Sequence, residues 1–382
     1  MRLQVKRALP IYWLDEDTVR IGAQQGITQE LRDYAGELRS LLPLLDGTRE
    51  MDELLHEAGI ALPSLTAEQL RAGMALLDDC GLLEDASLYD HLPEKLHANQ
   101  AFFAAAAANT GSPSNMAQGR ISDSHVLLLG LGGGGSASVP SLLALGVKKL
   151  TIVDYDIVES SNLNRQTLYR TKDVGRFKVD VAAEYADAFA PDVSVSAFNQ
   201  RISCVESVTS WPSSVDDVKR LGADADAILC AIDEPPFVAQ RRVNAAAVEL
   251  GVPAVFLLSQ HTRGRVFSVV PGLSGCMDCL QIHDEVSTED FLPQYRALMS
   301  PERVGATAAL APHIQRLVSF GTDEIVRLIT QYAAPFAAGK QMEVDYLTGN
   351  LGTVMEWERE PGCPTCGERD ARYDHIFEIA PL

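Results

Sequence analysis

The stretch from His125 to Lys178 constrains the fold of this chain more than any other part of its sequence. It opens with an apolar run over residues 126–129, whose length and glycine boundary favour a buried strand over an amphipathic helix. A glycine-rich segment and a helix of small apolar residues follow. A second apolar run over residues 150–153 then ends at Asp154. This order predicts a β-α-β unit, the building block of a parallel sheet covered by helices.

Three glycines of this unit, Gly130, Gly132 and Gly135, have the spacing G-x-G-x-x-G, with Gly133 between them. Glycines at this place let the backbone approach phosphate groups at the N-terminus of a helix. At the end of the next strand, the carboxylate of Asp154 is placed to bind the hydroxyl groups of a ribose. The unit therefore predicts a nucleotide site, and a purely structural glycine turn is the alternative.

The residues after Asp154 distinguish a triphosphate from a dinucleotide. Polar and cationic side chains are concentrated in this part of the sequence, namely Asn162, Asn164, Arg165, Gln166 and Lys178. Two cations beside a helix N-terminus suit a triphosphate, because its charge is larger than that of a pyrophosphate. Each cation taken singly is equally compatible with a solvated surface charge. Together they favour ATP over a nicotinamide dinucleotide.

A further apolar run over residues 227–232 predicts another buried strand, with Asp233 at its carboxyl end. The carboxyl ends of parallel strands meet at one edge of the sheet, where nucleotides bind. Carboxylate oxygens are preferred ligands of Mg²⁺ that is bound to phosphates. We therefore predict that Asp233 holds Mg²⁺ at the nucleotide site.

These motifs together resemble the ThiF/MoeB/HesA family of adenylating enzymes, which are relatives of ubiquitin-activating enzyme. The resemblance rests on GLGGGG, VDYDIVESSNLNRQ, DVGRFK and ILCAIDE and covers residues 121–382. It implies a Rossmann-like, doubly wound, mostly parallel sheet and a homodimer. The reaction that it implies is attack of a carboxylate on the α-phosphate of ATP, which gives an acyl adenylate and pyrophosphate.

The resemblance also implies roles for individual residues. The nucleotide-binding set is Gly130, Gly132, Gly133, Gly135, Asp154, Asp156, Asn162, Arg165, Gln166 and Lys178. Within this set Asp154 is expected on the ribose, and Asn162, Arg165 and Lys178 on the phosphates. The catalytic residues are expected to be Arg165, Lys178 and Asp233, with Asp233 binding Mg²⁺.

Four of the seven cysteines form two C-x-x-C pairs, Cys276 with Cys279 and Cys363 with Cys366. Glycine and proline around the pairs make tight turns that direct two thiolates toward one metal, so the sequence predicts a structural, tetrahedral Zn²⁺ site. Two unrelated redox or buried pairs are the alternative. The odd number of cysteines argues against a disulfide framework. The family resemblance implies the same zinc site.

Cysteine is absent between Cys279 and Cys363, the region where family members that pass the acyl group to a thioester keep one. We therefore expect the adenylate to be attacked directly by a nucleophile of the substrate, or by a second enzyme. Cys204 and Cys230 are flanked by apolar strand patterns and are predicted to be core residues.

Residues 1–92 predict a small α+β domain that resembles a winged helix, with short strands followed by three helices over residues 28–45, 48–59 and 66–80. A generic adaptor and a DNA-binding winged helix are alternatives, but acid-rich helices disfavour DNA. The domain is similar to the PqqD-like peptide-recognition element of ribosomal-peptide biosynthesis. In that element a leader peptide adds as a strand to the sheet.

Residues 93–120 are predicted to link this domain to the ATP-binding domain at 121–382. The family usually carries an R-x-x-R-Q-like segment here, whose arginine reaches the ATP of a neighbouring subunit. This chain has Asn99-Gln100 in its place, and Arg120 is only a loose substitute.

Composition excludes several classes of protein. A net charge of −20 argues against a nucleic-acid surface, which needs clustered cations. Uninterrupted apolar runs are too short to span a membrane, and the N-terminal sequence has no signal-peptide pattern, so we expect a cytoplasmic protein.

The function predicted from the sequence is ATP- and Mg²⁺-dependent adenylation of a carboxylate on a ribosomally made precursor peptide, with the leader peptide as partner. Direct attack by a nearby nucleophile would then form a ring, crosslink or amide. The alternatives are a catalytically silent scaffold that presents a peptide, and an adenylyltransferase of a sulfur-carrier protein. A nicotinamide oxidoreductase is disfavoured by the cations and the cysteine pairs.

Overall fold

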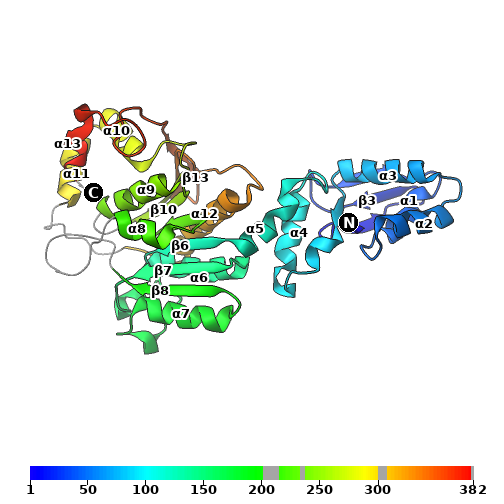
Figure 1. Cartoon of the computed structure of the whole chain (residues 1–382), viewed down its shortest axis with the longest axis horizontal. Helices are drawn as coiled ribbons and strands as arrows, with labels where there is room; N and C mark the ends of the chain where they lie inside the picture. Colours follow the sequence, from blue (N-terminus) through cyan, green and yellow to red (C-terminus); the bar gives the residue numbers. More distant parts are fainter. Residues whose placement is uncertain (201–214, 233–236, 300–307, 380–382) are drawn as a thin grey trace. The chain divides into compact units, whose positions relative to one another are not determined.

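The structure is a computed structural model and describes residues 1–200, 215–232, 237–299 and 308–379 (Figure 1). The chain forms two compact units. The first contains Met1–Arg120 together with the short segment Thr330–Ala333, and the second contains Ile121–Ile329 and Ala334–Leu382. Each unit has its own hydrophobic core.

The first unit begins with short antiparallel strands and continues with helices, in the order that the sequence predicts. Its three-stranded sheet has the order β2-β3-β4, and β1 pairs separately with β5. The strands are β1 (Leu3–Val5), β2 (Ile11–Trp13), β3 (Thr18–Ile21), β4 (Gln29–Arg32) and β5 (Leu83–Asp85). The main helices are α1 (Glu37–Leu41), α2 (Met51–Ala61), α3 (Ala67–Asp79) and α4 (His97–Ala106).

Local sequence explains where one helix of this unit begins, and the structure corrects the predicted bounds of another. Helix α3 begins at a capping box, in which Thr66 accepts from the N–H of Gln69 and Gln69 accepts from the N–H of Thr66. The helix expected over residues 28–45 is wrong in its first part, which is strand β4. Pairing with β3 overrides the apolar spacing there, and α1 starts only after Gly36, whose φ is 74°.

The second unit is built on an eight-stranded sheet with the order β13-β12-β11-β10-β9-β6-β7-β8. Five strands are parallel, namely β6 (His125–Leu129), β7 (Lys149–Asp154), β8 (Ser194–Asn199), β9 (Ala227–Cys230) and β10 (Ala254–Gln260). An antiparallel extension follows, with β11 (Arg263–Val269), β12 (Lys340–Asp345) and β13 (Leu351–Glu356). The predicted doubly wound, mostly parallel sheet is confirmed. Strand order reverses between β6 and β9, so the switch point lies there.

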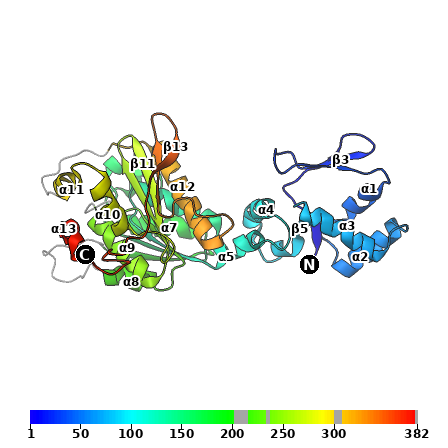
Figure 2. The same cartoon turned by 90° about the horizontal axis from the view of Figure 1, so that it is seen from above.

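Helices cover both faces of this sheet (Figures 1 and 2). Leu257 of β10 faces Gly134 and Gly321, which belong to α6 and α12. On the opposite face, Leu127 of β6 packs near Gly222 of α8, and α8 packs beside α9. The helices are α6 (Gly133–Leu145), α7 (Lys178–Phe189), α8 (Val215–Gly222), α9 (Val238–Leu250), α10 (Met277–Ser287), α11 (Phe291–Met299), α12 (Ala311–Thr330) and α13 (Asp374–Phe377).

One hydrophobic cluster of the second unit lies between the sheet and the α8–α9 layer, and contains the stacked pair Phe256 and Phe267. The predicted core position of Cys230 is confirmed, since it is 1% exposed. Cys204 lies outside the described residues. Among the helices that the structure describes, none combines the length and the apolar character needed to cross a membrane.

Candidate nucleotide site and cysteine cluster

The glycine loop between β6 and α6 has a conformation that other residues do not tolerate. Gly130 has φ +89°, and a Cβ there would lie 2.8 Å from the carbonyl oxygen of Ala231. A Cβ on Gly135 would lie only 1.7 Å from the carbonyl oxygen of Gly130. Gly132 is the N-cap of α6, so the free N–H groups of the first helical turn lie at the carboxyl edge of the sheet. This geometry fits the binding of an anion.

Asp154, at the end of β7, holds the glycine loop in place. One carboxylate oxygen accepts the N–H of Leu131 at 2.5 Å, and the other accepts the N–H of Asp156 at 2.7 Å. Burial raises the pKa of Asp154, and the nearby Lys178 ammonium opposes this effect. The carboxylate therefore joins the loop to the next strand, at the position that the sequence predicts for a ribose-binding acid.

Lys178 lies at the start of α7 and is buried, with its side chain 5% exposed. Its ammonium donates to Asp156 over 2.8 Å, and the backbone N–H of Lys178 donates to the carbonyl oxygen of Asp156. The side chain of Asp156 is 45% exposed. The structure thus connects the glycine loop, Asp154, Asp156 and Lys178 through direct contacts.

The segment between Asp156 and Lys178 carries the remaining predicted residues. Asn162 is buried, and its side-chain oxygen accepts the N–H of Glu159 at 3.1 Å. Arg165 donates within its own segment, to the carbonyl of Ser161 and the side chain of Asn164. Gln166 is 2% exposed, and its Oε1 has no hydrogen-bond partner in the described structure. The hydrogen bonds of Arg165 thus stay within its own segment, and the structure does not bring it together with Lys178 or Asp154.

Asp233 lies outside the described residues, so its predicted contact with Mg²⁺ stays a prediction. The backbone immediately before it is well fixed. The N–H of Ala231 donates to the carbonyl of Leu129, and Gln240 of α9 donates to the carbonyl of Ile232 at 2.8 Å. Arg120, the substitute for the linker arginine, donates to the carbonyl of Thr330 within the first unit.

Two residues at this edge of the sheet were missed by the sequence reasoning. The hydroxyl of Tyr169 donates to the carbonyl of Leu131 at 2.9 Å, and burial raises the pKa of Tyr169. The backbone N–H of Gln200 donates to the carbonyl of Asp154, and its buried Nε2 has no partner among the described residues. Gln200 directly follows β8 in the structure, and a strand-end argument like that applied to Asp154 and Asp233 finds it once the end of this strand is known. No sequence signal marked Tyr169.

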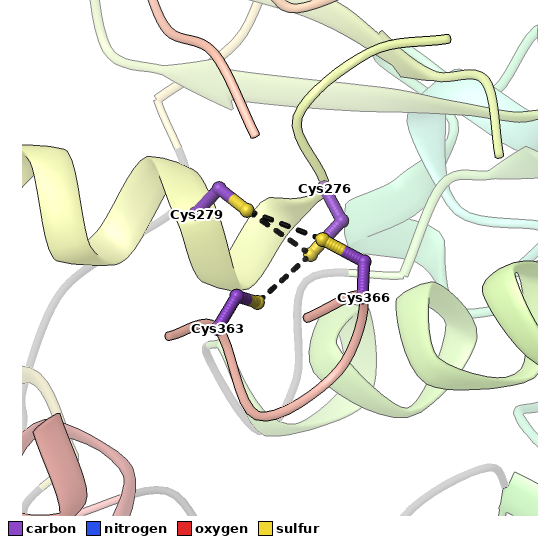
Figure 3. A group of neighbouring side chains, drawn as sticks. All are labelled: Cys276, Cys279, Cys363 and Cys366. Carbon is purple, nitrogen blue, oxygen red and sulfur yellow. Dashed lines mark hydrogen bonds between the residues drawn. The ribbon is translucent and has the colours of Figure 1, made fainter. Parts of the chain in front are cut away.

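The four cysteines of the two C-x-x-C pairs come together although corresponding cysteines of the pairs are 87 positions apart in the sequence (Figure 3). Cys276 Sγ lies 3.5 Å from Cys363 Sγ, and Cys279 Sγ lies 3.3 Å from Cys366 Sγ. All four sulfur atoms lie within 4.8 Å of one another. Tetrahedral Zn²⁺ with Zn–S bonds of about 2.3 Å requires sulfur atoms roughly 3.8 Å apart. The donor set and its geometry therefore fit structural Zn²⁺, as the sequence predicts.

Comparison with known proteins identifies the chain. The ThiF family model matches residues 101–365. The sulfur carrier protein ThiS adenylyltransferase of Escherichia coli is 28% identical, over 66% of this chain and 90% of the relative. The molybdopterin-synthase adenylyltransferase of the same organism is 29% identical, with the same coverage.

The fold is shared with a solved structure, that of E. coli MccB with ATP, at a TM-score of 0.71 and 18% identity. The match covers 96% of this chain and 100% of the other. Since the family model spans most of the sequence and the relatives are adenylyltransferases, the predicted class of adenylating enzyme is confirmed, and the chain belongs to the ThiF family.

Proposed function

We propose that this protein uses ATP to activate a carboxylate of a ribosomally made peptide as an acyl adenylate. The observation that carries the proposal is the connected set of the glycine loop, Asp154, Asp156 and Lys178 at the switch point of the sheet. A helix N-terminus supplies N–H donors, a buried acid follows on the next strand, and a buried ammonium lies beside it. These are the groups that a nucleotide with a charged phosphate chain requires.

In the proposed mechanism the N–H groups of the first turn of α6 bind the phosphates of ATP, and Asp154 accepts the ribose hydroxyl groups. Lys178 leaves Asp156 and donates to a phosphate oxygen, where it stabilises the charge that develops during transfer. Arg165 and Asn162 are proposed to contact the phosphates after their segment closes on the nucleotide. Asp233 would hold Mg²⁺, which supplies charge neutralisation on the phosphate oxygens when bound.

The first chemical step forms a bond between a carboxylate oxygen of the peptide and the α-phosphorus atom of ATP. The bond from that phosphorus to the bridging oxygen of the β-phosphate breaks, and pyrophosphate leaves with its electron pair. The peptide is then an acyl adenylate. Because the sequence holds no cysteine between Cys279 and Cys363, a nucleophile of the peptide itself is proposed to displace AMP, forming a ring, crosslink or amide.

The first unit is proposed to bind the peptide. Its sheet order β2-β3-β4 leaves β2 and β4 as the outer strands, and an extended peptide can add to the edge of such a sheet. The comparison supports this assignment. One matched structure is the microcin C7 biosynthetic enzyme MccB in complex with N-formylated MccA, and its match covers 96% of this chain, whereas the curated adenylyltransferases cover 66%.

We also propose that the enzyme acts as a homodimer, as the family resemblance implies. The family's linker arginine, which reaches the phosphates from the second copy, is absent here, where Asn99-Gln100 stands in its place. Arg165 is the alternative source of this charge within one chain.

Activation of a sulfur-carrier protein is a second candidate, because one of the relatives named above is the sulfur carrier protein ThiS adenylyltransferase. Both candidates share the adenylation step and differ in the protein that supplies the carboxylate. The peptide is favoured because those relatives match 66% of this chain, whereas the MccB structures match 96% of it.

ATP–pyrophosphate exchange tests the proposal and separates the two candidates. Purified protein with Mg²⁺ and ATP is assayed with short peptides encoded beside its gene and, separately, with a sulfur-carrier protein of the same organism. Exchange and AMP release that require the peptide, and that Lys178→Met abolishes, are expected. Exchange with the carrier alone would favour the second candidate. ADP formation, or peptide binding without turnover, would overturn adenylation and favour a scaffold.

A further inference from the structure

A buried ion pair connects the cysteine cluster to helix α9. Arg241 of α9 donates from Nε to Asp278 Oδ1 at 2.9 Å and from Nη2 to Asp278 Oδ2 at 3.0 Å. Asp278 is 0% exposed and Arg241 3% exposed. A guanidinium and a carboxylate buried in this way stabilise a fold only when both are held in good geometry. This pair therefore fixes the separation of α9 and α10.

Both C-x-x-C pairs contact this ion pair or the helix that bears it. Asp278 stands between Cys276 and Cys279 in the sequence, and the hydroxyl of Thr365, which stands between the other two cysteines, donates to Asp278 Oδ2 at 2.7 Å. In addition, the N–H of Met277 donates to the side-chain oxygen of Asn244, one turn beyond Arg241 on α9. The position of α9 thus depends on how the four cysteines hold their two loops together.

The other end of this connection is the nucleotide edge of the sheet. Gln240, the residue before Arg241, donates from Nε2 to the carbonyl of Ile232 at 2.8 Å. Ile232 lies two residues after the carboxyl end of β9, the strand beside the switch point. Two successive residues of α9 therefore make the two contacts. Gln240 binds the backbone just after β9, and Arg241 binds Asp278 of the cysteine cluster.

We propose that Arg241 and Asp278 are positioning residues through which the zinc-loaded cysteine cluster fixes the carboxyl end of β9 at the nucleotide site. The assignment of that edge to ATP rests on the proposed function. The consequence is that loss of zinc, or oxidation of the cysteines, loosens the nucleotide site while the rest of the sheet stays folded. The cluster is then a determinant of activity as well as of stability.

Hydrogen–deuterium exchange of the full-length protein tests this link without requiring catalysis. In the wild type, stripping zinc with a chelator is expected to raise amide exchange over residues 227–232 and 237–242 at least tenfold. Asp278→Asn should raise amide exchange over these residues by a similar factor while it still binds one zinc ion per chain. Removing zinc from this variant should then raise the exchange by less than a further twofold. Arg241→Lys, which keeps the charge and one hydrogen bond, should be intermediate.

Trp357→Phe is the matched control, because the indole of Trp357 donates to the carbonyl of Cys276, a contact of the cluster that involves neither Arg241 nor Asp278. With zinc bound, this variant should leave exchange over 227–232 within twofold of the wild type. Zinc-independent exchange in the wild type, or an equal effect of Trp357→Phe and Asp278→Asn, would overturn the proposal. A parallel titration should show at least tenfold weaker binding of Mg²⁺–ATP by Asp278→Asn. A wild type that binds no ATP would refute the proposed function, while the exchange data would still decide on the link.

Discussion

Lys178 donates to Asp156 over 2.8 Å, with the lysine side chain 5% exposed and the aspartate side chain 45% exposed. The ammonium is therefore buried and neutralised by an acid that stays in contact with solvent. A phosphate oxygen that reached Lys178 would replace Asp156 as its partner without leaving the ammonium unpaired at any stage. In this arrangement Asp156 is the ion-pair partner of the buried lysine until the nucleotide arrives.

Replacing the two partners of this pair should affect different properties. Loss of the lysine should lower activity, and loss of the aspartate should lower the stability of the ATP-free protein. Lys178→Met removes a donor to the reacting phosphates and should lower kcat/KM for pyrophosphate exchange by at least 100-fold, or about 3 kcal/mol. Asp156→Asn leaves the buried ammonium without its counter-charge and should destabilise the ATP-free protein by roughly 1–3 kcal/mol. ATP should then raise the melting temperature of Asp156→Asn more than that of the wild type. Equal shifts in both proteins would contradict the exchange of partners.

Neighbouring glycines of the loop provide a matched test of its close packing. A Cβ on Gly135 would overlap the carbonyl oxygen of Gly130 at 1.7 Å, whereas a Cβ on Gly134 would meet the side chains of Ala231 and Leu257 at 3.5 Å, an ordinary contact. Gly135→Ala is therefore expected to displace the loop and abolish ATP binding measured by calorimetry. Gly134→Ala should bind ATP normally and gain up to about 1 kcal/mol from its higher helix propensity. If Gly135→Ala still binds ATP, then ATP binding does not require this conformation of the glycine loop.

The β-α-β unit was predictable because its signals are local. A short apolar run, a glycine spacing and an acid at the next strand end each follow from one stretch of sequence, and they placed Asp154 and the loop correctly. The two C-x-x-C pairs were also predictable, although they are distant in sequence, because a tetrahedral metal site needs four ligands and the two pairs together supply four thiolates. In each case the chemistry of the residue types restricts the geometry.

Contacts that depend on tertiary packing were not predicted from the sequence. The apolar spacing around Leu31 favours a helix, yet pairing of Leu31 with Val19 makes it part of a strand. Tyr169 touches Leu131 only because the segment after Asp156 folds back over the glycine loop. The ion pair between Arg241 and Asp278 joins α9 to α10, and no local sequence pattern indicates that these two helices pack together.

Zinc binding should depend on the four clustered cysteines and on no other. Wild-type protein is expected to contain one zinc ion per chain by mass spectrometry of metals. Cys363→Ser should lose most of it and melt at a lower temperature, because a structural zinc site contributes folding free energy directly. Cys80→Ser, in the first unit, is the control and should keep its zinc. Zinc retained at full stoichiometry in Cys363→Ser would place the metal elsewhere.

Asp284 of α10 should destabilise the protein at neutral pH. Burial raises its pKa from 3.8 to about 6, against the opposing charges of His283 and Arg265. A carboxyl whose folded pKa exceeds its unfolded value contributes stability below the unfolded pKa, and this stability is lost as the pH rises through the folded pKa. Asp284→Asn should therefore be more stable than the wild type by up to about 3 kcal/mol at pH 8, and by little at pH 4. Urea unfolding of both proteins at each pH measures the difference, and any zinc lost in acid affects both alike. A constant difference across the pH range would mean that Asp284 does not titrate in this window.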